Sequence, residues 1–173
     1  QMIPLHGISV VLDAALSPRG RLRHWTLIGT GQDRPLVEAA LASAEVAHID
    51  WREWVPYDQL SIEIGKADLC LGIFGNSAKA ASVVPNKVYQ ALLSGRSVIT
   101  RASPAMLETF GDDQPGLELV PPGDPEAVLD AIERLERAGF PAIREDRIAL
   151  SHPAEIARIL VRHAAPLLGS PAT

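Results

Sequence analysis

Two spacings of apolar residues alternate along the chain. Short apolar runs bounded by turn residues are typical of buried strands, whereas apolar residues that recur every three or four positions are typical of helices packed on a core. The expected strands are 25–28, 46–51, 69–74, 97–100 and 117–120. The expected helices are 7–16, 34–43, 60–67, a helix from Pro85 up to Gly95, then 104–110, 125–137 and 153–168.

This alternation predicts the fold class. Strands that alternate with helices indicate β-α-β units and a mostly parallel α/β sheet of the doubly wound kind, covered on both faces. The length of 173 residues fits one such domain over residues 1–140, with 141–173 as a helical extension packed on it. Because the first helix is expected to begin near Gly7, we expect the first strand to be largely missing and the chain to belong to a longer protein.

Composition narrows the function classes. The net charge is −5 without a basic tract, which argues against a nucleic-acid partner, because such binding depends on phosphate neutralisation. No apolar run approaches the roughly 20 residues of a membrane span, so we predict no transmembrane segment. The single cysteine, Cys70, lies in an expected strand, where we interpret it as a small core residue of a cytoplasmic protein.

Several catalytic patterns are absent from the sequence. Gly29-Thr30-Gly31 lacks the third glycine of a dinucleotide fingerprint, so we interpret it as a tight turn. No set of His, Cys, Asp and Glu has metal-ligand spacing, and we therefore expect no metal. There is no nucleophile elbow and no Cys–His arrangement.

The helix that opens at Pro85 offers a candidate anion site. The backbone N–H groups of Asn86, Lys87 and Val88 are expected to be free at its positive end, with the Lys87 ammonium nearby. Gln90 follows one turn later on the same face. This combination suits a diphosphate joined to a ribose; alternatively, Lys87 is solvated and Gln90 caps a neighbouring loop. His6, at the start of the first helix, is a second candidate anion contact.

The string ADLCLGIFG…VVPNKVYQALLSGRSVIT, with PLHGISVVLDAA, HWTLIGTGQDRPLVEAAL, WVPYDQL and LELVPPGDPEAVLDAI, resembles the donor-binding half of the group 1 glycosyltransferases of the GT-B type. The resemblance covers Ile3–Arg137 in the family's order. It implies a Rossmann-like domain that binds a nucleotide-diphospho-sugar. It also implies a missing amino-terminal domain that holds the acceptor.

Site roles follow from the same resemblance. The two glutamates of the family's E-x7-E element fall on Ser82 and Gln90, so both are absent, and Gln90 is expected to bind the ribose. Lys87 is expected to stabilise the leaving diphosphate as the catalytic residue. His6 occupies the place of a phosphate-binding lysine. The resemblance assigns the remaining donor contacts to the loop 82–86 and to the loop that holds the base, namely Val83, Val84, Asn86, Trp54 and Val55.

The resemblance thus predicts a glycosyltransferase domain that passes a sugar to an acceptor glycan, lipid carrier or small molecule, with no cofactor or metal. The general base is expected in the missing domain, so this chain is expected to be inactive alone. Its location is expected to be cytoplasmic, or at the inner membrane face through that missing domain. Two alternatives stay open: a nucleotide-sugar 2-epimerase-type domain, and a non-catalytic doubly wound binding or scaffold domain.

Overall fold

A computed structural model describes residues 2–42 and 46–142. The five strands are β1 (Trp25–Ile28), β2 (Ile49–Arg52), β3 (Leu69–Leu71), β4 (Ser97–Arg101) and β5 (Leu117–Val120). The α-helices are α1 (Ile8–Leu16), α2 (Arg34–Ala42), α3 (Tyr57–Lys66), α4 (Ala78–Ala81), α5 (Asn86–Leu93), α6 (Pro104–Phe110) and α7 (Pro125–Ala138). Two 3-10 turns, η1 (Pro4–His6) and η2 (Gly20–Leu22), complete the described elements.

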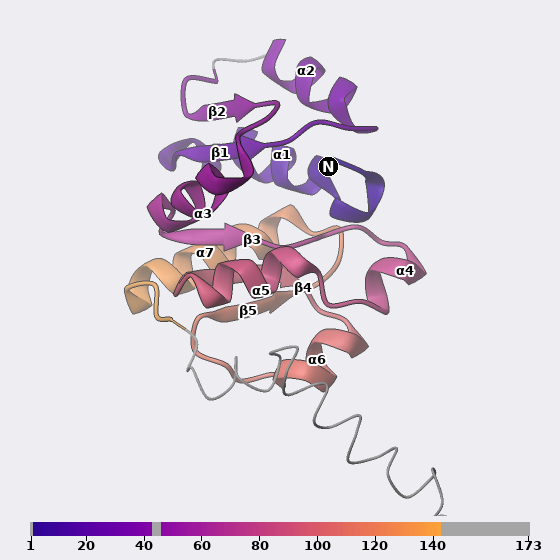
Figure 1. Cartoon of the computed structure of the whole chain (residues 1–173), viewed down its shortest axis with the longest axis vertical. Helices are drawn as coiled ribbons and strands as arrows, with labels where there is room; N and C mark the ends of the chain where they lie inside the picture. Colours follow the sequence, from indigo (N-terminus) through magenta and orange to yellow (C-terminus); the bar gives the residue numbers. More distant parts are fainter. Residues whose placement is uncertain (1, 43–45, 143–173) are drawn as a thin grey trace, which may run out of the picture.

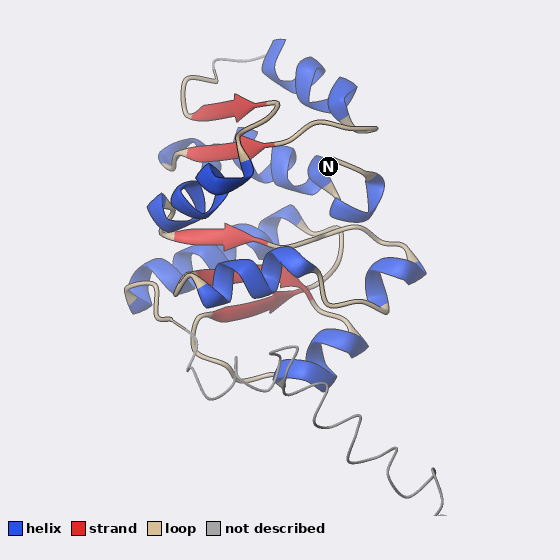
Figure 2. Cartoon of the chain, in the orientation of Figure 1, coloured by secondary structure: helices blue, strands red, loops and turns tan. Residues whose placement is uncertain are grey.

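All the described strands pair in parallel, but they form two sheets instead of one. β1 pairs only with β2, and β3, β4 and β5 form a second sheet in that order. Figures 1 and 2 show the strands running in the same direction with helices on both faces. The expected α/β class and parallel pairing are therefore confirmed, and the carboxyl ends of the strands lie at one edge of the fold.

The core has two parts, one on each face of the β3–β5 sheet. On one face, α1 and α7 pack together over both sheets, burying Phe74, Ile99 and Val120. On the other face, α5 and α6 cover Val98 and Leu117. Val98 and Ile99 are neighbours in β4, and their side chains point into opposite parts of the core because successive side chains of a strand alternate between its faces. All residues of β4 are buried.

Polar side chains fix where several helices begin. Asp124 caps α7, accepting a hydrogen bond from the Ala127 amide (2.9 Å), and Pro125 is the first helical residue, as the sequence indicates. Ser103 caps α6 in the same way through the Met106 amide (3.2 Å).

The strand expected over 69–74 ends early. The Thr100 hydroxyl takes the place of a ladder partner, accepting from the Ile73 amide (3.1 Å) and donating to the Ile73 carbonyl (3.2 Å). Gly72 permits this approach, because a Cβ there would lie 2.3 Å from the Thr100 hydroxyl oxygen. The chain remains buried through Gly75, but its regular pairing stops at Leu71.

Thr100→Val is expected to destabilise the fold by about 1–3 kcal/mol, because it leaves the buried Ile73 amide without its acceptor at nearly unchanged volume. Thermal or urea unfolding measures the loss. Thr109→Val is the matched control, since the Thr109 hydroxyl donates to the Ala105 carbonyl on an exposed helix surface (2.8 Å). Equal unfolding midpoints for the two variants would contradict the assigned role of Thr100.

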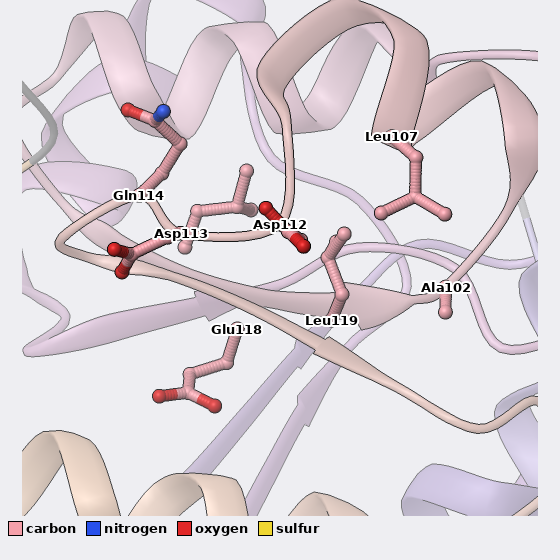
Figure 3. A pocket seen from close by; sticks show the side chains of 8 residues that line it. Ala102, Leu107, Asp112, Asp113, Gln114, Glu118 and Leu119 are labelled. Carbon is pink, nitrogen blue, oxygen red and sulfur yellow. The ribbon is translucent and has the colours of Figure 1, made fainter.

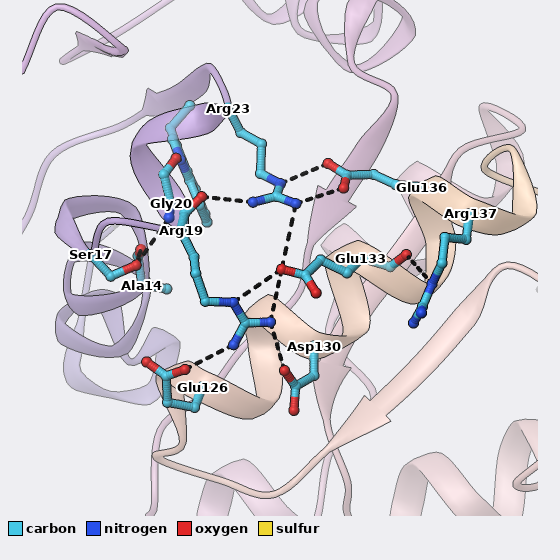
Figure 4. A network of polar contacts seen from close by, with 11 residues as sticks. Ala14, Ser17, Arg19, Gly20, Arg23, Glu126, Asp130, Glu133, Glu136 and Arg137 are labelled. Carbon is cyan, nitrogen blue, oxygen red and sulfur yellow. Dashed lines mark hydrogen bonds and ion pairs between the residues drawn. The ribbon is translucent and has the colours of Figure 1, made fainter.

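A cluster of ion pairs ties the segment after α1 to α7 (Figure 4). The Arg19 guanidinium contacts Glu126, Asp130 and Glu133 at 2.7–2.9 Å. Arg23 binds Glu136 through two hydrogen bonds (2.7 and 2.6 Å), and this contact lowers the pKa of the Glu136 carboxyl. Nearby, the Trp25 indole donates to the Gly20 carbonyl (2.9 Å). These contacts link β1 to the helix that lies under β4 and β5.

Other departures from the expected elements are local. The strand expected over 46–51 corresponds to β2, which begins only at Ile49. Residues 46–49 form a turn instead, in which the Ile49 amide donates to the Val46 carbonyl (2.8 Å). The short helix α4 was not expected; Ser77 caps it through the Ala80 amide (3.1 Å). Pro85 caps α5 and is not its first helical residue. The helix expected over 153–168 lies outside the described residues, as does nearly all of the extension expected over 141–173.

Candidate functional site

The carboxyl edge of the strands collects most of the candidate residues. The turn η1 lies against α4 at this edge. The amides of Phe74 and Gly75, which follow β3, donate to the carbonyls of His6 (3.0 Å) and Leu5 (3.2 Å). His6 is therefore held beside the loop that leads from β3 into α4. Chain segments far apart in the sequence meet there.

Two glycines allow this contact of backbone with backbone. Gly7 has a φ of 63°, and a Cβ on it would lie 2.6 Å from both the Phe74 carbonyl carbon and the Gly75 nitrogen. A Cβ on Gly75 would lie 2.5 Å from the Leu5 carbonyl oxygen. Since neither position has room for a side chain, the amino end of α1 and the end of β3 come together without intervening side chains.

The amino end of α5 presents free donors. The amides of Asn86 and Lys87 have no hydrogen-bond acceptor among the described residues. The Val88 amide was also expected to be free, but this is wrong: it donates to the Pro85 carbonyl (2.9 Å), because Pro85 adopts an extended cap conformation. Val88 and Leu92 are buried in the core, whereas Asn86 is exposed and Lys87 and Gln90 are partly buried.

Lys87 lies in the first turn of α5. Within the described part of the chain, no carboxylate lies within ion-pairing distance of its ammonium, in contrast to Lys66, which contacts Glu63 (2.8 Å). The surrounding protein removes water from the amine, and this burial lowers the pKa of Lys87 to about 8. For Gln90, the alternative considered from the sequence was that its side chain caps a neighbouring loop. In the structure the Gln90 side chain is partly exposed, and the Gln90 backbone carbonyl accepts a hydrogen bond from the Ser94 hydroxyl (2.8 Å).

The loop between α4 and α5 brings the other predicted residues to the same place. Ser82 ends α4, where its hydroxyl donates to the Lys79 carbonyl (3.1 Å) and its side chain is exposed. Val83 follows, and Val84 packs against the α5–α6 part of the core. The loop is thus anchored at one end by Val84, directly before the free amides of α5.

The residues expected to hold the base belong to the other sheet. Trp54 and Val55 follow β2, the outer strand of the two-stranded sheet, so they share the carboxyl edge but lie away from α5. The Trp54 side chain is 75% exposed and that of Tyr57, at the start of α3, is 82% exposed. The loop therefore presents two aromatic surfaces to solvent.

Arg101 was not singled out in the sequence, although it ends an apolar strand with a charge. It is buried, and its guanidinium donates to the carbonyls of Gly75 and, at 3.3 Å, Ala102. No carboxylate among the described residues pairs with it. Within the described part of the chain, a second cation without an acidic partner thus lies at the carboxyl end of β4.

A pocket beside β5 and α6 has the opposite character. Figure 3 shows Asp112, Asp113 and Glu118 around it, so it is unsuited to a diphosphate.

The described residues contain no group of three or more His, Cys, Asp or Glu side chains placed to hold a metal ion. Within the same residues, no helix is long and apolar enough to cross a bilayer. Burial raises the pKa of the Cys70 thiol, which favours the unreactive form.

A parallel α/β fold with helices on both faces of its strands defines a Rossmann-like domain. The family described as "Glycosyl transferases group 1" matches residues 2–137. The chain belongs to this family, and the resemblance drawn from the sequence is confirmed.

Solved structures agree with this assignment in fold. Sucrose-phosphate synthase from Thermosynechococcus elongatus superposes with a TM-score of 0.68 at 20% identity, over 96% of this chain and 43% of that one. The pneumococcal O-GlcNAc transferase GtfA in complex with UDP and GlcNAc superposes with a TM-score of 0.67 at 17% identity, over 97% of this chain and 34% of that one. The chain thus spans less than half the length of either. No curated protein sequence matches it.

Proposed function

We propose that this chain binds the donor, a nucleotide-diphospho-sugar, for a glycosyltransferase. The observation that carries the proposal is the amino end of α5, where, among the described residues, two amides have no acceptor and the Lys87 ammonium has no carboxylate partner. Family membership supplies the reaction class. GtfA, which shares the fold, was solved in complex with UDP, and this supports a nucleoside diphosphate as the ligand.

In this reaction the bond between the sugar C1 and the diphosphate oxygen breaks, and the diphosphate leaves with the electron pair. The acceptor oxygen forms the new bond to C1 and gives its proton to a base. We assign to Lys87 and to the Asn86 amide, in the first turn of α5, the stabilisation of the charge that develops on the leaving diphosphate. We assign phosphate contact to His6 and the loop 83–84, and no bound metal or further cofactor is needed for these roles.

The remaining groups are assigned to the nucleoside. The Gln90 amide, one turn after Lys87, offers one donor and one acceptor to the ribose hydroxyls. The exposed Trp54 ring and the Val55 backbone are assigned to the base. Ser82 carries no charge where the family's first glutamate is expected, so the contact to the sugar itself is a hydroxyl and not a carboxylate.

A nucleotide screen tests the proposal. We expect one of UDP, GDP, ADP and dTDP to raise the melting temperature of the chain and to bind in calorimetry, equally with and without magnesium. The corresponding nucleosides, which lack phosphate, are the matched controls and should have little effect. Absence of any response at millimolar diphosphate, or equal responses to nucleosides, would contradict the proposed site.

We further propose that the acceptor and the general base are contributed from outside this chain. The isolated chain is then expected to bind donor without passing the sugar to an acceptor. Incubation with labelled nucleotide-sugars and candidate acceptors checks this directly. Robust transfer by the isolated chain would contradict this part of the proposal.

A further inference from the structure

The backbone of residues 73–75, which follows β3, bridges β4 and η1. Towards β4, the Ile73 carbonyl accepts a hydrogen bond from the Arg101 amide (2.9 Å). Towards η1, the amides of Phe74 and Gly75 donate to two of its carbonyls (3.0 and 3.2 Å). Because the regular pairing of β3 has already ended, these individual hydrogen bonds determine where the three residues lie.

The Arg101 side chain completes this bridge. Gly75 is buried, and among the described residues the only donor to its carbonyl is the Arg101 guanidinium, through Nη1. The Arg101 Nε donates to the Ala102 carbonyl (3.3 Å), and the residue is 7% exposed. Without the guanidinium, the Gly75 carbonyl would be buried without a partner.

Gly75 connects the position of Arg101 to that of η1. It is held from two sides, because its amide donates to the Leu5 carbonyl and its own carbonyl accepts from Arg101. A Cβ on Gly75 would lie 2.5 Å from the Leu5 carbonyl oxygen, so backbone lies directly on backbone. His6 is the next residue of η1, which lies against α4 (Figure 1). Since closely packed groups transmit small shifts, a displacement of Gly75 displaces the turn that carries His6.

The charge of Arg101 argues for more than a structural role. No carboxylate among the described residues pairs with it. A neutral donor would satisfy the Gly75 carbonyl equally well, whereas a buried cation without a carboxylate destabilises the unliganded fold. An anion bound at the carboxyl edge offsets this cost, because the positive charge then favours the complex.

We propose that Arg101 is a positioning residue of the donor site. Its guanidinium fixes Gly75, Gly75 fixes η1, and η1 holds His6 where it meets the phosphate of the donor. This inference rests on the donor-binding function proposed above, and in it Arg101 acts through the backbone without touching the ligand. The planar fork of arginine suits this task, because it reaches the carbonyls of Gly75 and Ala102 together.

NMR of the ligand-free chain tests the structural part of the proposal. Arg101→Met is expected to shift the ring signals of His6 and to speed amide exchange at Gly75 at least about 10-fold. The matched control is Arg134→Met, which removes a guanidinium that pairs with Glu118 at the surface (2.8 Å) and should change neither signal. Unchanged His6 and Gly75 signals in folded Arg101→Met would overturn the proposal, whatever the chain binds.

Calorimetry with the nucleoside diphosphate that the wild-type chain binds best tests the functional part. Arg101→Met is expected to weaken binding about 3- to 30-fold, the range typical of residues that act through others. Arg101→Lys should recover part of the loss, because an ammonium also donates to a carbonyl. Arg101→Gln replaces the methionine variant in every comparison if methionine prevents folding. Normal affinity in the variant tested overturns this inference alone, whereas a wild-type chain that binds no diphosphate overturns the proposed function and this inference with it.

Double-mutant cycles identify the path from Arg101 to the ligand. The combined loss of affinity in His6→Ala with Arg101→Met should fall short of the product of the single losses, because both changes remove the same contact. Lys87→Met with Arg101→Met should multiply the single losses, since Lys87 is held by α5 and not by η1. Independent effects in both cycles, or equal coupling of Arg101 to His6 and to Lys87, would overturn the assignment.

Discussion

Gly7→Ala is expected to destabilise the fold by about 2–5 kcal/mol. The left-handed conformation of Gly7 costs a side-chain-bearing residue about 1–2 kcal/mol. The new Cβ would also lie 2.6 Å from backbone atoms of Phe74 and Gly75, which cannot rotate away. Such overpacking costs typically about 1–3 kcal/mol. Chemical denaturation followed by circular dichroism measures the sum.

Gly95→Ala separates the two causes. Gly95 has nearly the same φ, 68°, but a Cβ there meets nothing within 4 Å. It should therefore show only the conformational cost, about 1–2 kcal/mol. If Gly7→Ala were no more destabilising than Gly95→Ala, the close approach of α1 to the end of β3 would not be a packing constraint. Because His6 precedes Gly7, the first variant should also weaken nucleotide binding, whereas Gly95→Ala should not.

Lys87→Met is expected to weaken binding of the preferred nucleoside diphosphate about 10- to 100-fold. A charge-assisted hydrogen bond contributes about 1.5–3 kcal/mol, and about 1.4 kcal/mol corresponds to a factor of ten. Methionine keeps the length of the side chain and removes the charge. Lys79→Met, at an exposed position in α4, is the matched control and should bind normally. Equal affinities for the two variants would remove Lys87 from the site.

Through Lys87, a rise in pH is expected to increase the free energy of unfolding and to decrease the affinity for diphosphate. Its pKa of about 8 lies below the ordinary value of 10.5, so the folded state disfavours the charged amine. The contribution of Lys87 to the free energy of unfolding should rise as pH increases from about 8 to 10.5. Diphosphate requires the charged form, so its affinity should fall as pH rises above about 8. Calorimetry at pH 7 and pH 9.5 measures the change, which should be absent in Lys87→Met.

The sequence predicted the order and type of the main elements because their signals are local. Asp124-Pro125 marks the start of α7, and the run Leu117–Val120 is a strand as expected. The early end of β3 could not be predicted in this way, because it depends on the hydroxyl of Thr100, twenty-seven positions beyond Ile73. The division into two sheets depends on pairing between distant strands, which no single segment encodes.

The candidate site was predictable only in part. Pro85, Asn86 and Lys87 are adjacent in sequence, so the free amides and the cation at the start of α5 could be inferred from helix geometry. The hydrogen bond from Arg101 to Gly75 and the contact between Gly7 and Gly75 could not, because each joins segments that are far apart in the sequence. The ribose, base and phosphate roles came from the family resemblance and stay predictions until binding is measured.

The tryptophan fluorescence of this chain reports on only part of the fold. All three, Trp25, Trp51 and Trp54, lie in or just after the two-stranded sheet β1–β2. The indoles of Trp25 and Trp51 donate to carbonyls, and Arg34 lies over the Trp51 ring at 5.8 Å, whereas Trp54 is largely exposed. Emission excited at about 295 nm therefore reports on one half of the fold and on the loop after β2. Unfolding confined to β3–β5 would leave it nearly unchanged, while a ligand stacked on Trp54 would alter it at once.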